Sequence, residues 1–520
     1  MEARGSLSMK LDSFGVALVF GLGAVSLVIG CSSSSSSTAG MDGGGASGES
    51  GGSGTDSGGT PDSSASGASA SSGGSGGGFD AGRDGGNATS GGNSGSGGSG
   101  SSGANGNSGS SGTGASGSGG VGGSSDAGGV GASDGGSGGG LHVHGGLIVD
   151  GQGNTVRLHG VNETGSQTNC TYQVGGAAGD GYPGFFDMAP TQAGVDQMLA
   201  WKVNAVRVPL NEDCWLGING LPYGDSTSSD YQSAMSRFVS LLTANGLAVI
   251  VDLHWAGPGT DQANGSLGQI PMADADHAVA FWSSVASTFK GNGSVLFDLY
   301  NEPGITDWTC WVSGATASAQ CAQANGTSYA VAGMATMLQA VRSAGASNIA
   351  ILGGLSLSQD FSKWVTSVQS IPTLPAPLDG ISIDNVAASW HAYDFNSAYT
   401  QCPSQYNQPP YSVQTCATAE QFATSSGIAV VLSAGFPVVI GEMGISAFSA
   451  STASNFSSAQ LTVLQSWLDG VMTYMESRQQ GYLAWSWDLD QNPVLITDFA
   501  TGAPTPYFGA TYQMHLQSTF

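Results

Sequence analysis

Residues 141–520 of this chain predict a (β/α)8 barrel, and three features of the sequence support that fold class. Eight short apolar segments rich in β-branched residues recur along this part of the chain. Stretches with helical spacing fall between them, and several of the apolar segments are hydrophobic without interruption, as fully buried parallel strands are. Strands interleaved with helices over this length favour a closed barrel. An open doubly wound sheet is the alternative, but no Gly-rich phosphate-binding loop follows the first strand.

The same pattern places the individual elements. A hairpin-like lead-in at Leu147–Gly151 precedes strands expected at Thr155–Val161, Ala205–Pro209, Ala248–Leu253, Val295–Tyr300, Ile349–Leu352, Ala387–His391, Pro437–Gly441 and Gly481–Trp485. Helices are expected at 191–202, 230–245, 275–289, 327–344, 419–434 and 459–478. In a (β/α)8 barrel the active site lies at the C-terminal ends of the strands. The residues that end these strands are therefore the candidates for function.

Composition changes sharply upstream of the predicted barrel. Residues 32–140 consist almost entirely of Gly, Ser, Ala, Thr, Asn and Asp, with hardly any large apolar side chain. Such a stretch cannot bury enough surface to offset the entropy lost on ordering, so we expect it to be disordered. The sequence thus predicts a signal segment over 1–30, a disordered Gly/Ser-rich linker over 31–140 and one catalytic domain over 141–520.

The N-terminal segment has the form of a secretory signal. Arg4 and Lys10 precede an apolar run from Phe14 to Gly30, which is followed at once by Cys31. The run is marginal for a membrane span, which needs about 20 apolar residues, whereas a basic start and a short apolar core are typical of exported proteins. Cys31 after an Ile-Gly pair resembles a bacterial lipobox, which implies a cell-envelope lipoprotein whose only membrane contact is a lipid on Cys31. A cleaved signal that releases a secreted protein, or an uncleaved anchor, is the alternative.

Cysteine usage agrees with export. Of the seven cysteines, Cys31 belongs to the signal, which leaves an even set of six. An even set in an exported chain indicates disulfides. Two pairs are close enough in sequence to close single loops and the remaining two then pair by elimination, which predicts Cys310–Cys321, Cys402–Cys416 and Cys170–Cys214. Metal binding is the alternative, but no Cys-x2-Cys spacing is present.

The chain is strongly acidic. Its formal net charge is −26, from 37 acidic and 11 basic residues. Because Lys and Arg are so scarce, there is no basic patch for a phosphate backbone, and nucleic acid is not expected as a partner. The acidity mainly indicates solubility and carries little information about the substrate. We expect a monomer without a cofactor and without a catalytic metal.

Two glutamates stand in matching contexts. Glu302 lies in Asn-Glu-Pro and Glu442 in Gly-Glu-Met-Gly, and each follows a short β-branched run where the strand is expected to stop. Glycoside hydrolysis needs two carboxyl groups on either side of one scissile bond, one protonated and one ionised. Rigid strand ends can hold such groups at a fixed spacing. The alternative is that each glutamate simply solvates the end of a strand.

The other strand ends carry unusual polar and aromatic side chains, namely Asn162, Glu163, Arg207, Glu212, His254, Trp255, His391, Tyr393, Trp485 and Trp487. Together with the two glutamates this set resembles glycoside hydrolase family 5, in the clan of retaining (β/α)8 hydrolases. The resemblance covers essentially all of 141–520, and the strand-end residues follow one another along the chain in the same order as in that family. The two glutamate motifs are specific to the clan. The resemblance to family 5 within that clan is carried by Arg207, His254, His391, Tyr393 and Trp485.

The resemblance implies a role for each glutamate. Glu302 would be the general acid/base, kept protonated, while the preceding Asn301 bonds a sugar 2-hydroxyl. Glu442 would be the nucleophile, and the flanking Gly441 and Gly444 would let the sugar approach the backbone. For a retaining mechanism the two carboxyl groups should lie about 5–5.5 Å apart.

The resemblance also assigns the surrounding side chains to substrate binding or electrostatic support. A fixed cation nearby lowers the pKa of a carboxylate, so Arg207 would hold Glu442 ionised, and Tyr393 would donate a hydrogen bond to it. His254 and His391 would bond substrate hydroxyls or the acid. The alternatives are a structural ion pair for Arg207 and satisfied core positions for the two histidines.

Two tryptophans end the last predicted strand. Trp485 and Trp487 alternate along it, so one should face the barrel interior and the other should pack outward. By resemblance, Trp485 forms the stacking floor beneath the sugar, with a cis peptide bond to Ser486. Glu163 and Glu212 are the competing carboxylates and are expected to position substrate.

The combined reading is an exported, retaining hydrolase of a β-glycan, most specifically an endo-β-1,4-glucanase. The Cys-containing loops are not general family features, so β-mannan, mixed-linkage glucan and xyloglucan remain open as substrates. Two alternatives come from other classes: a non-catalytic carbohydrate-binding lipoprotein, and a metal hydrolase that uses His254 and His391. Against the metal hydrolase, the sequence contains no His-Glu-x-x-His spacing.

Overall fold

A computed structural model describes residues 140–519 except for 172–176, 180–181, 260–268, 315–320, 322–328 and 395–415. The predicted signal segment, Cys31 and nearly all of the linker lie outside the described residues. Among the described helices, none is both long and apolar enough to cross a membrane.

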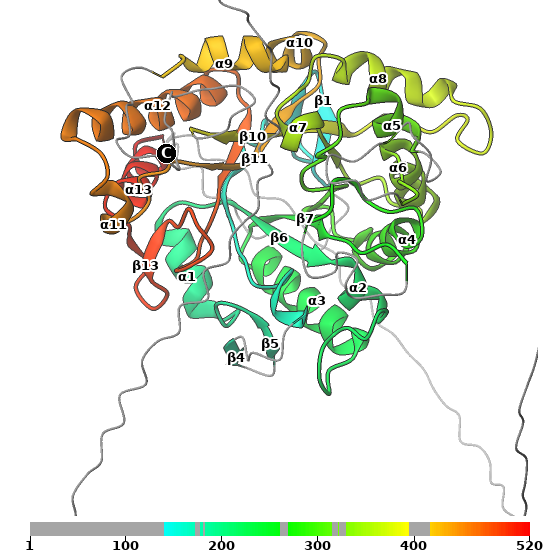
Figure 1. Cartoon of the computed structure of the whole chain (residues 1–520), viewed down its shortest axis with the longest axis horizontal. Helices are drawn as coiled ribbons and strands as arrows, with labels where there is room; N and C mark the ends of the chain where they lie inside the picture. Colours follow the sequence, from blue (N-terminus) through cyan, green and yellow to red (C-terminus); the bar gives the residue numbers. More distant parts are fainter. Residues whose placement is uncertain are drawn as a thin grey trace, which may run out of the picture. The chain divides into compact units, whose positions relative to one another are not determined.

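Within the described residues, eight parallel strands close into a barrel, which confirms the predicted fold class (Figure 1). In chain order the barrel strands are β3 (His159–Asn162), β6 (Ala205–Asn211), β7 (Ala248–Trp255), β8 (Val295–Asp298), β9 (Ala350–Gly353), β10 (Val386–Tyr393), β11 (Val438–Gly444) and β12 (Gly481–Ala484). Each strand pairs with the next one in this order, and β12 closes the barrel on β3. All eight predicted strands therefore exist, with ends that shift by a few residues.

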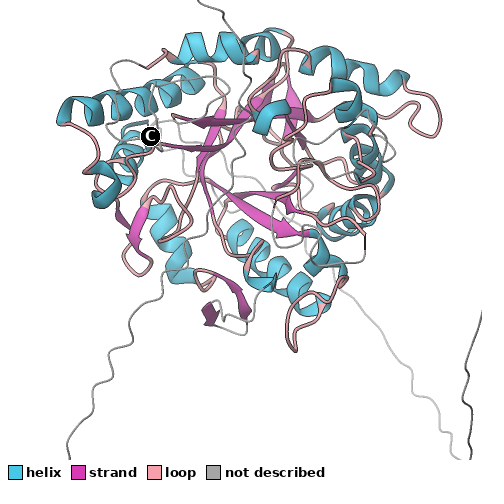
Figure 2. Cartoon of the chain, viewed as in Figure 1, coloured by secondary structure: helices cyan, strands magenta, loops and turns pink. Residues whose placement is uncertain are grey.

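Helices surround the barrel strands (Figure 2). Their bounds are α1 (Gln192–Ala200), α2 (Glu212–Leu216), α3 (Ser228–Ala244), α4 (Ala278–Phe289), α5 (Trp308–Ser313), α6 (Met334–Ser343), α7 (Leu355–Ser358), α8 (Trp364–Ser370), α9 (Ala419–Ser426), α10 (Ile428–Ser433), α11 (Ala450–Ala453), α12 (Ser458–Ser477) and α13 (Phe508–Thr519). The single helix expected at 419–434 is wrong. Gly427 has φ 90° and separates α9 from α10, because a left-handed residue ends a helix.

The longer helices begin and pack as their sequences dictate. Thr227 caps α3 in a reciprocal pair with Asp230, and Ser457 caps α12 in the same way with Gln460, which satisfies amide groups that a helix N-terminus otherwise leaves free. In α3 the buried residues recur at helical spacing, for example Tyr231, Met235, Phe238 and Leu242. One face of each helix therefore packs on the barrel and the other meets solvent.

Small two-stranded sheets and 3-10 turns complete the described part. They are β1 (His142–His144) with β2 (Leu147–Val149), β4 (Ala177–Gly179) with β5 (Tyr182–Phe186), β13 (Ile496–Asp498) with β14 (Ala503–Pro504), and the turns η1 (Asn169–Thr171) and η4 (Ile371–Thr373). The β1–β2 hairpin confirms the predicted lead-in.

Two apolar cores hold the barrel together and determine where polar groups can lie. One fills the lumen and consists of Ile148, Leu158, Ala205, Ala248, Ile250, Leu296, Ile349, Ile351, Ala387, Val439 and Leu483. Ile148 comes from β2, so the lead-in hairpin covers the N-terminal end of the barrel. The second core joins outward-facing strand residues such as Val206 and Val208 to helix residues such as Phe238 and Trp282. Polar lumen residues are thus confined to the C-terminal end.

Two of the predicted disulfides are confirmed. Cys170 pairs with Cys214 and Cys310 pairs with Cys321. The first bridge joins the loop after β3 to α2, which follows β6 directly, and so ties two neighbouring loops at the same end of the barrel. Cys416 is also disulfide-bonded, while Cys402 lies outside the described residues.

Candidate active site

The site forms where the residues at the lumen-facing positions of the barrel strands change from apolar to polar. On β7 the lumen positions run from Ala248 and Ile250 to Asp252 and His254. On β6 they run from Ala205 to Arg207. Because side chains of a strand alternate between its two faces, polar residues at these positions must meet in the lumen above the apolar core.

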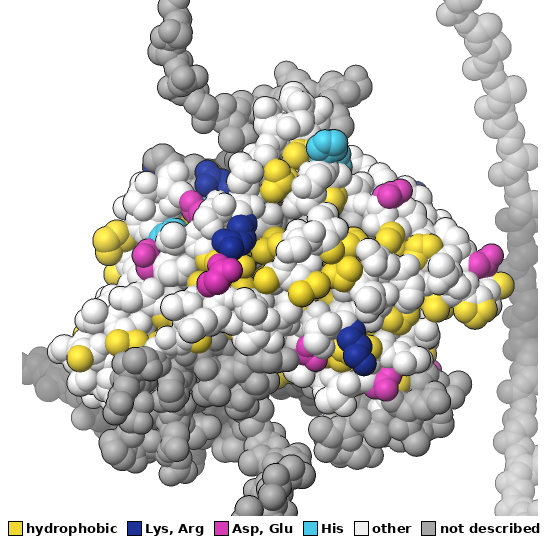
Figure 3. Space-filling model, turned by 90° about the horizontal axis from the view of Figure 1, so that it is seen from above, with side chains coloured by type: hydrophobic (Ala, Val, Ile, Leu, Met, Phe, Trp, Pro, Cys, Tyr) yellow, Lys and Arg dark blue, Asp and Glu magenta, His cyan; other side chains and the backbone are white. Residues whose placement is uncertain are grey.

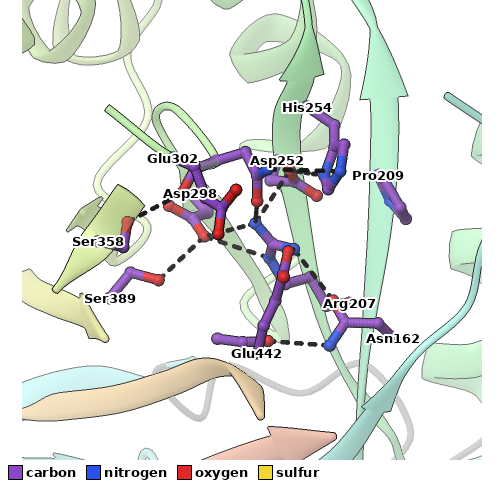
Figure 4. A network of polar contacts seen from close by, with 12 residues as sticks. Asn162, Arg207, Pro209, Asp252, His254, Asp298, Glu302, Ser358, Ser389 and Glu442 are labelled. Atoms are coloured by element: carbon purple, nitrogen blue, oxygen red, sulfur yellow. Dashed lines mark hydrogen bonds and ion pairs between the residues drawn. The ribbon is translucent and has the colours of Figure 1, made fainter. Parts of the chain in front are cut away.

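Arg207 occupies the centre of this polar layer (Figure 4). Its guanidinium is fully buried and donates five hydrogen bonds, to Asn162 Oδ1 (3.0 Å), Asp252 Oδ2 (3.0 Å), Asp298 Oδ2 (3.2 Å), Asn301 Oδ1 (2.7 Å) and Glu442 Oε1 (2.9 Å). These acceptors come from β3, β7, β11 and, for both Asp298 and Asn301, the end of β8 and the residues that follow it. One planar cation thus fixes the position of every carboxylate around it.

The buried charges in this layer shift each other's pKa values. Burial acts to lower the pKa of Arg207, but the carboxylates of Asp252, Asp298 and Glu442 raise it above its ordinary value. Burial raises the pKa of Asp298 to about 7, against the opposing effect of Arg207. The arginine therefore stays charged.

Both carboxylate oxygens of Glu442 are held by protein donors. Arg207 Nη1 lies 2.9 Å from Oε1, and Tyr393 donates its hydroxyl hydrogen to Oε2 at 2.7 Å. The side chain is 6% exposed. Donors on both oxygens orient the carboxylate and leave it a narrow opening towards the cleft.

Glu442 reaches the lumen because of a strand irregularity. The register between β10 and β11 shifts between Trp390 and His391, so that Trp390 pairs with Ile440 and His391 with Glu442. Gly441 is the additional residue, and such a bulge turns the following side chain to the other face. The expectation that the strand stops before Glu442 is wrong, since β11 continues to Gly444.

Gly441 and Gly444 were expected to let the sugar approach the backbone, but side chains of the protein fill the space beside them. A Cβ at Gly441 would lie 2.6 Å from Ser389 Oγ, and one at Gly444 would lie 2.5 Å from Pro493 Cγ. Both glycines are required because neighbouring side chains already fill that space.

Glu302 is more open to solvent than Glu442, with 16% of its side chain exposed. His391 Nδ1 lies 2.9 Å from Oε1, and Gln269 Nε2 donates to Oε2 at 3.1 Å. Burial acts to raise the pKa of Glu302, but the hydrogen bond and charge of His391 bring it below its ordinary value. Burial acts to lower the pKa of His391, and the charge of Glu442 and the bond to Glu302 raise it.

The pKa of Glu302 is thus lowered and that of His391 raised, opposite in direction to the expectation that Glu302 is kept protonated. The His391 ring faces two carboxylates at once, because Nδ1 also lies 3.5 Å from Glu442 Oε2. A carboxyl oxygen of each glutamate and a ring nitrogen of His391 lie within 4.8 Å of one another. That spacing suits two carboxyl groups acting on opposite sides of one glycosidic bond with retention.

An aromatic floor lies beside the pair. Trp485 stacks on His254 with ring centroids 5.2 Å apart and an interplanar angle of 15°, and His254 Nδ1 is held by Asp252 Oδ2 at 2.9 Å. The peptide bond from Trp485 to Ser486 is cis, as predicted. Trp487 packs outward, edge-on to Trp201, so the choice between the two tryptophans is confirmed.

Two predicted carboxylates lie outside this arrangement. Glu212 is buried beside Asp274, and Glu163 is buried beside Asp187 and Asp488. Glu163 directly follows Asn162, whose side chain contacts Arg207, and Glu212 directly follows Asn211, which caps α2. Neither glutamate belongs to the group around Glu302 and Glu442. The expectation that they position substrate is therefore wrong.

The structure adds three residues that the sequence analysis did not name for the site: Asp252, Asp298 and Gln269. The first two contact Arg207, and a signal for them was available, since each occupies a lumen position one alternation beyond an apolar one. Gln269 lies on a long loop after β7. No pattern in the sequence could have placed it against Glu302.

Comparisons with known proteins agree with this geometry. The sequence profile named Cellulase (glycosyl hydrolase family 5) matches residues 149–491. Endoglucanase E-5 of Thermobifida fusca is 26% identical over 164 residues, which are 31% of this chain and 28% of that protein. The match thus spans under a third of that relative.

Solved structures that are similar to this chain include an endo-β-1,4-glucanase from Xanthomonas axonopodis pv. citri, with a TM-score of 0.47 and 18% identity over 70% of this chain and 100% of the other. A β-mannanase from Streptomyces thermolilacinus with mannohexaose has a TM-score of 0.44 and 20% identity over 73% of this chain and 96% of the other.

Proposed function

The chain belongs to glycosyl hydrolase family 5, and from this premise we propose that it is an endo-β-1,4-glucanase with Glu442 as nucleophile and Glu302 as general acid/base. Retaining hydrolysis of a β-glycan follows from the family. The observation that carries the assignment of roles is the asymmetry of the pair. Glu442 is held on both oxygens by Arg207 and Tyr393, whereas Glu302 is partly exposed and bonded to a proton carrier. The name of the Thermobifida fusca relative supports glucan as the substrate.

The proposed reaction uses these contacts in two steps. Glu442 attacks the anomeric carbon while the proton shared by Glu302 and His391 passes to the leaving glycosidic oxygen. The resulting glycosyl-enzyme ester is then hydrolysed by a water that gives its proton to Glu302. His254 and Asn301 are proposed to bond sugar hydroxyls, and Trp485 is proposed to stack beneath the ring.

A polysaccharide panel tests the glycan and the mode of attack. We expect carboxymethyl cellulose and mixed-linkage β-glucan to yield oligosaccharides of several lengths, with mannan and xylan at least about tenfold slower because hydroxyl groups in the site are left unpaired. Chromatography of early products and a reducing-sugar assay provide the measurement, with a Glu442→Ala protein as the background.

Each other result has a definite meaning. Faster release of reducing sugar from mannan than from glucan would identify the enzyme as a mannanase. A single short product would indicate exo attack. No reducing ends from any β-glycan would favour a non-catalytic binding protein. Loss of turnover on brief EDTA treatment at room temperature would favour the metal hydrolase.

We also propose that the N-terminal region exports and tethers a monomeric enzyme without taking part in its chemistry. The support is the lipobox-like Cys31 and the change of composition before Leu141. Cys31→Ala should leave the chain unlipidated and release it from the membrane fraction. A chain that starts at Leu141 should turn over a soluble glycan at an unchanged rate, measured against the tethered form. A severalfold slower rate would show that 1–140 belongs to the catalytic unit.

A further inference from the structure

A second group of carboxylates lies at the C-terminal end of the barrel. Asp187 follows β5, Asp488 and Asp490 lie in the loop after β12, and Glu163 comes directly after β3. One carboxylate oxygen from each of the three aspartates lies within 4.8 Å of the other two. Segments about 300 residues apart in sequence thus bring their acidic side chains to one place.

The charges recorded at this place are all negative. Burial, followed by the charge of the neighbouring Asp187, raises the pKa of Asp488 to about 6. Burial and then Asp488 raise the pKa of Asp490. Thr164 donates its hydroxyl hydrogen to Asp488, and Asn169 donates to Asp187 at 2.9 Å, but these neutral donors do not cancel the charge. Carboxylates this close need a cation or shared protons.

Glu163 is an independent sign that this place binds a ligand. Its residue is 1% exposed, and within the described part of the chain neither carboxyl oxygen has a hydrogen-bond partner. The next residue, Thr164, donates its hydroxyl hydrogen to Asp488 and accepts a backbone hydrogen bond from Asp187. Glu163 therefore lies beside the aspartates, and burial followed by their charges raises its pKa well above the ordinary value. An unpartnered buried carboxyl is costly unless something binds it.

We propose that Glu163, Asp187, Asp488 and Asp490 form a structural calcium site. The four side chains offer only oxygen, and Ca²⁺ takes six to eight oxygen ligands in flexible geometry, including bidentate carboxylates. Mg²⁺ requires a near-ideal octahedron and keeps its waters, while Zn²⁺ sites are built mainly from nitrogen and sulfur. The ion would hold three segments together: the loop after β3, the end of β5 and the loop after β12.

The position of the site explains what the ion would do. Asp488 follows Trp487 directly and lies three residues from Trp485, the proposed floor beneath the sugar. Binding would therefore stabilise this loop against unfolding without touching the reacting atoms. The group is distinct from Glu302, Glu442 and His391, none of which belongs to it.

The test uses the full chain, stripped with EDTA and dialysed into chelator-free buffer. Titration with CaCl2 in a calorimeter should show one saturable site, and Ca²⁺ at about 100 times Kd should raise Tm by about 5 °C, with a smaller shift for MgCl2 at equal concentration. Tb³⁺ should give luminescence sensitised by Trp487, and Ca²⁺ should quench it. The rate on soluble glycan at room temperature should stay unchanged after EDTA.

Variants separate this proposal from proton sharing among the carboxyls. Asp490→Asn removes an exposed member and should weaken Ca²⁺ binding at least about tenfold by loss of one charged ligand, whereas Asp379→Asn, at an exposed surface aspartate, should change nothing. Glu163→Gln should remove the Ca²⁺ shift while the calcium-free Tm stays at least as high as in wild type. No saturable heat and no Tm shift with Ca²⁺, or equal shifts in Asp490→Asn and wild type, would overturn the proposal.

Discussion

Glu442→Ala is expected to lose at least about 10⁴-fold in kcat on every β-glycan, as when a covalent nucleophile is removed. Glu442 and its partner Glu302 have carboxylate oxygens within 4.8 Å of each other. The folded state should survive, because Arg207 keeps its bonds to Asp252 and Asp298. The measurement is reducing-sugar release, with Glu420→Ala as a control on an exposed surface glutamate.

Added azide should restore part of the activity and reveal which glutamate has which role. In Glu442→Ala the anion enters the vacated side and attacks directly, which gives a glycosyl azide of inverted configuration. In Glu302→Ala, Glu442 still forms the ester from a substrate with a good leaving group, so azide should give the retained product. Full activity of Glu442→Ala, or the two configurations exchanged between the variants, would contradict the proposed roles.

Arg207→Ala is expected to lower the free energy of unfolding by about 3–5 kcal/mol and to abolish turnover. Removing one partner of a buried ion pair leaves uncompensated charge, and here Asp252, Asp298 and Glu442 all lose their cation. Urea unfolding measures the stability change. Arg478→Ala, whose ion pair with Glu420 is exposed, should cost less than about 1 kcal/mol.

Arg207→Lys separates the structural role from the catalytic one. The ammonium keeps the charge but cannot reproduce the five donors that reach five acceptors in one plane. We expect a folded protein with substantially lower kcat, because Glu442 loses the bond at Oε1. If Arg207→Lys were fully active, Arg207 would be a structural ion pair and its proposed effect on the nucleophile would be wrong.

The amino-acid sequence by itself determined the barrel, the two glutamates and two of the disulfides. Continuous apolar runs separated by helical spacing leave little choice of fold, and the family's strand-end motifs are local in sequence. The choice of Trp485 over Trp487 also came from such a motif. The apolar runs and the motifs depend on neighbours within a few residues, which a sequence displays directly, and the disulfides follow from the number and spacing of the cysteines.

Only the tertiary structure decided the features that depend on packing between distant strands. The bulge at Gly441 turns Glu442 into the lumen, and it follows from a register shift against β10 rather than from any local motif. The pKa of His391 is raised because carboxylates from two other segments face it. Glu163 and Glu212 directly follow strands β3 and β6, yet both are buried outside the group around Glu302 and Glu442. Which face a side chain takes, and what charge it meets there, is set by strand register and burial, and these exist only once the barrel has closed.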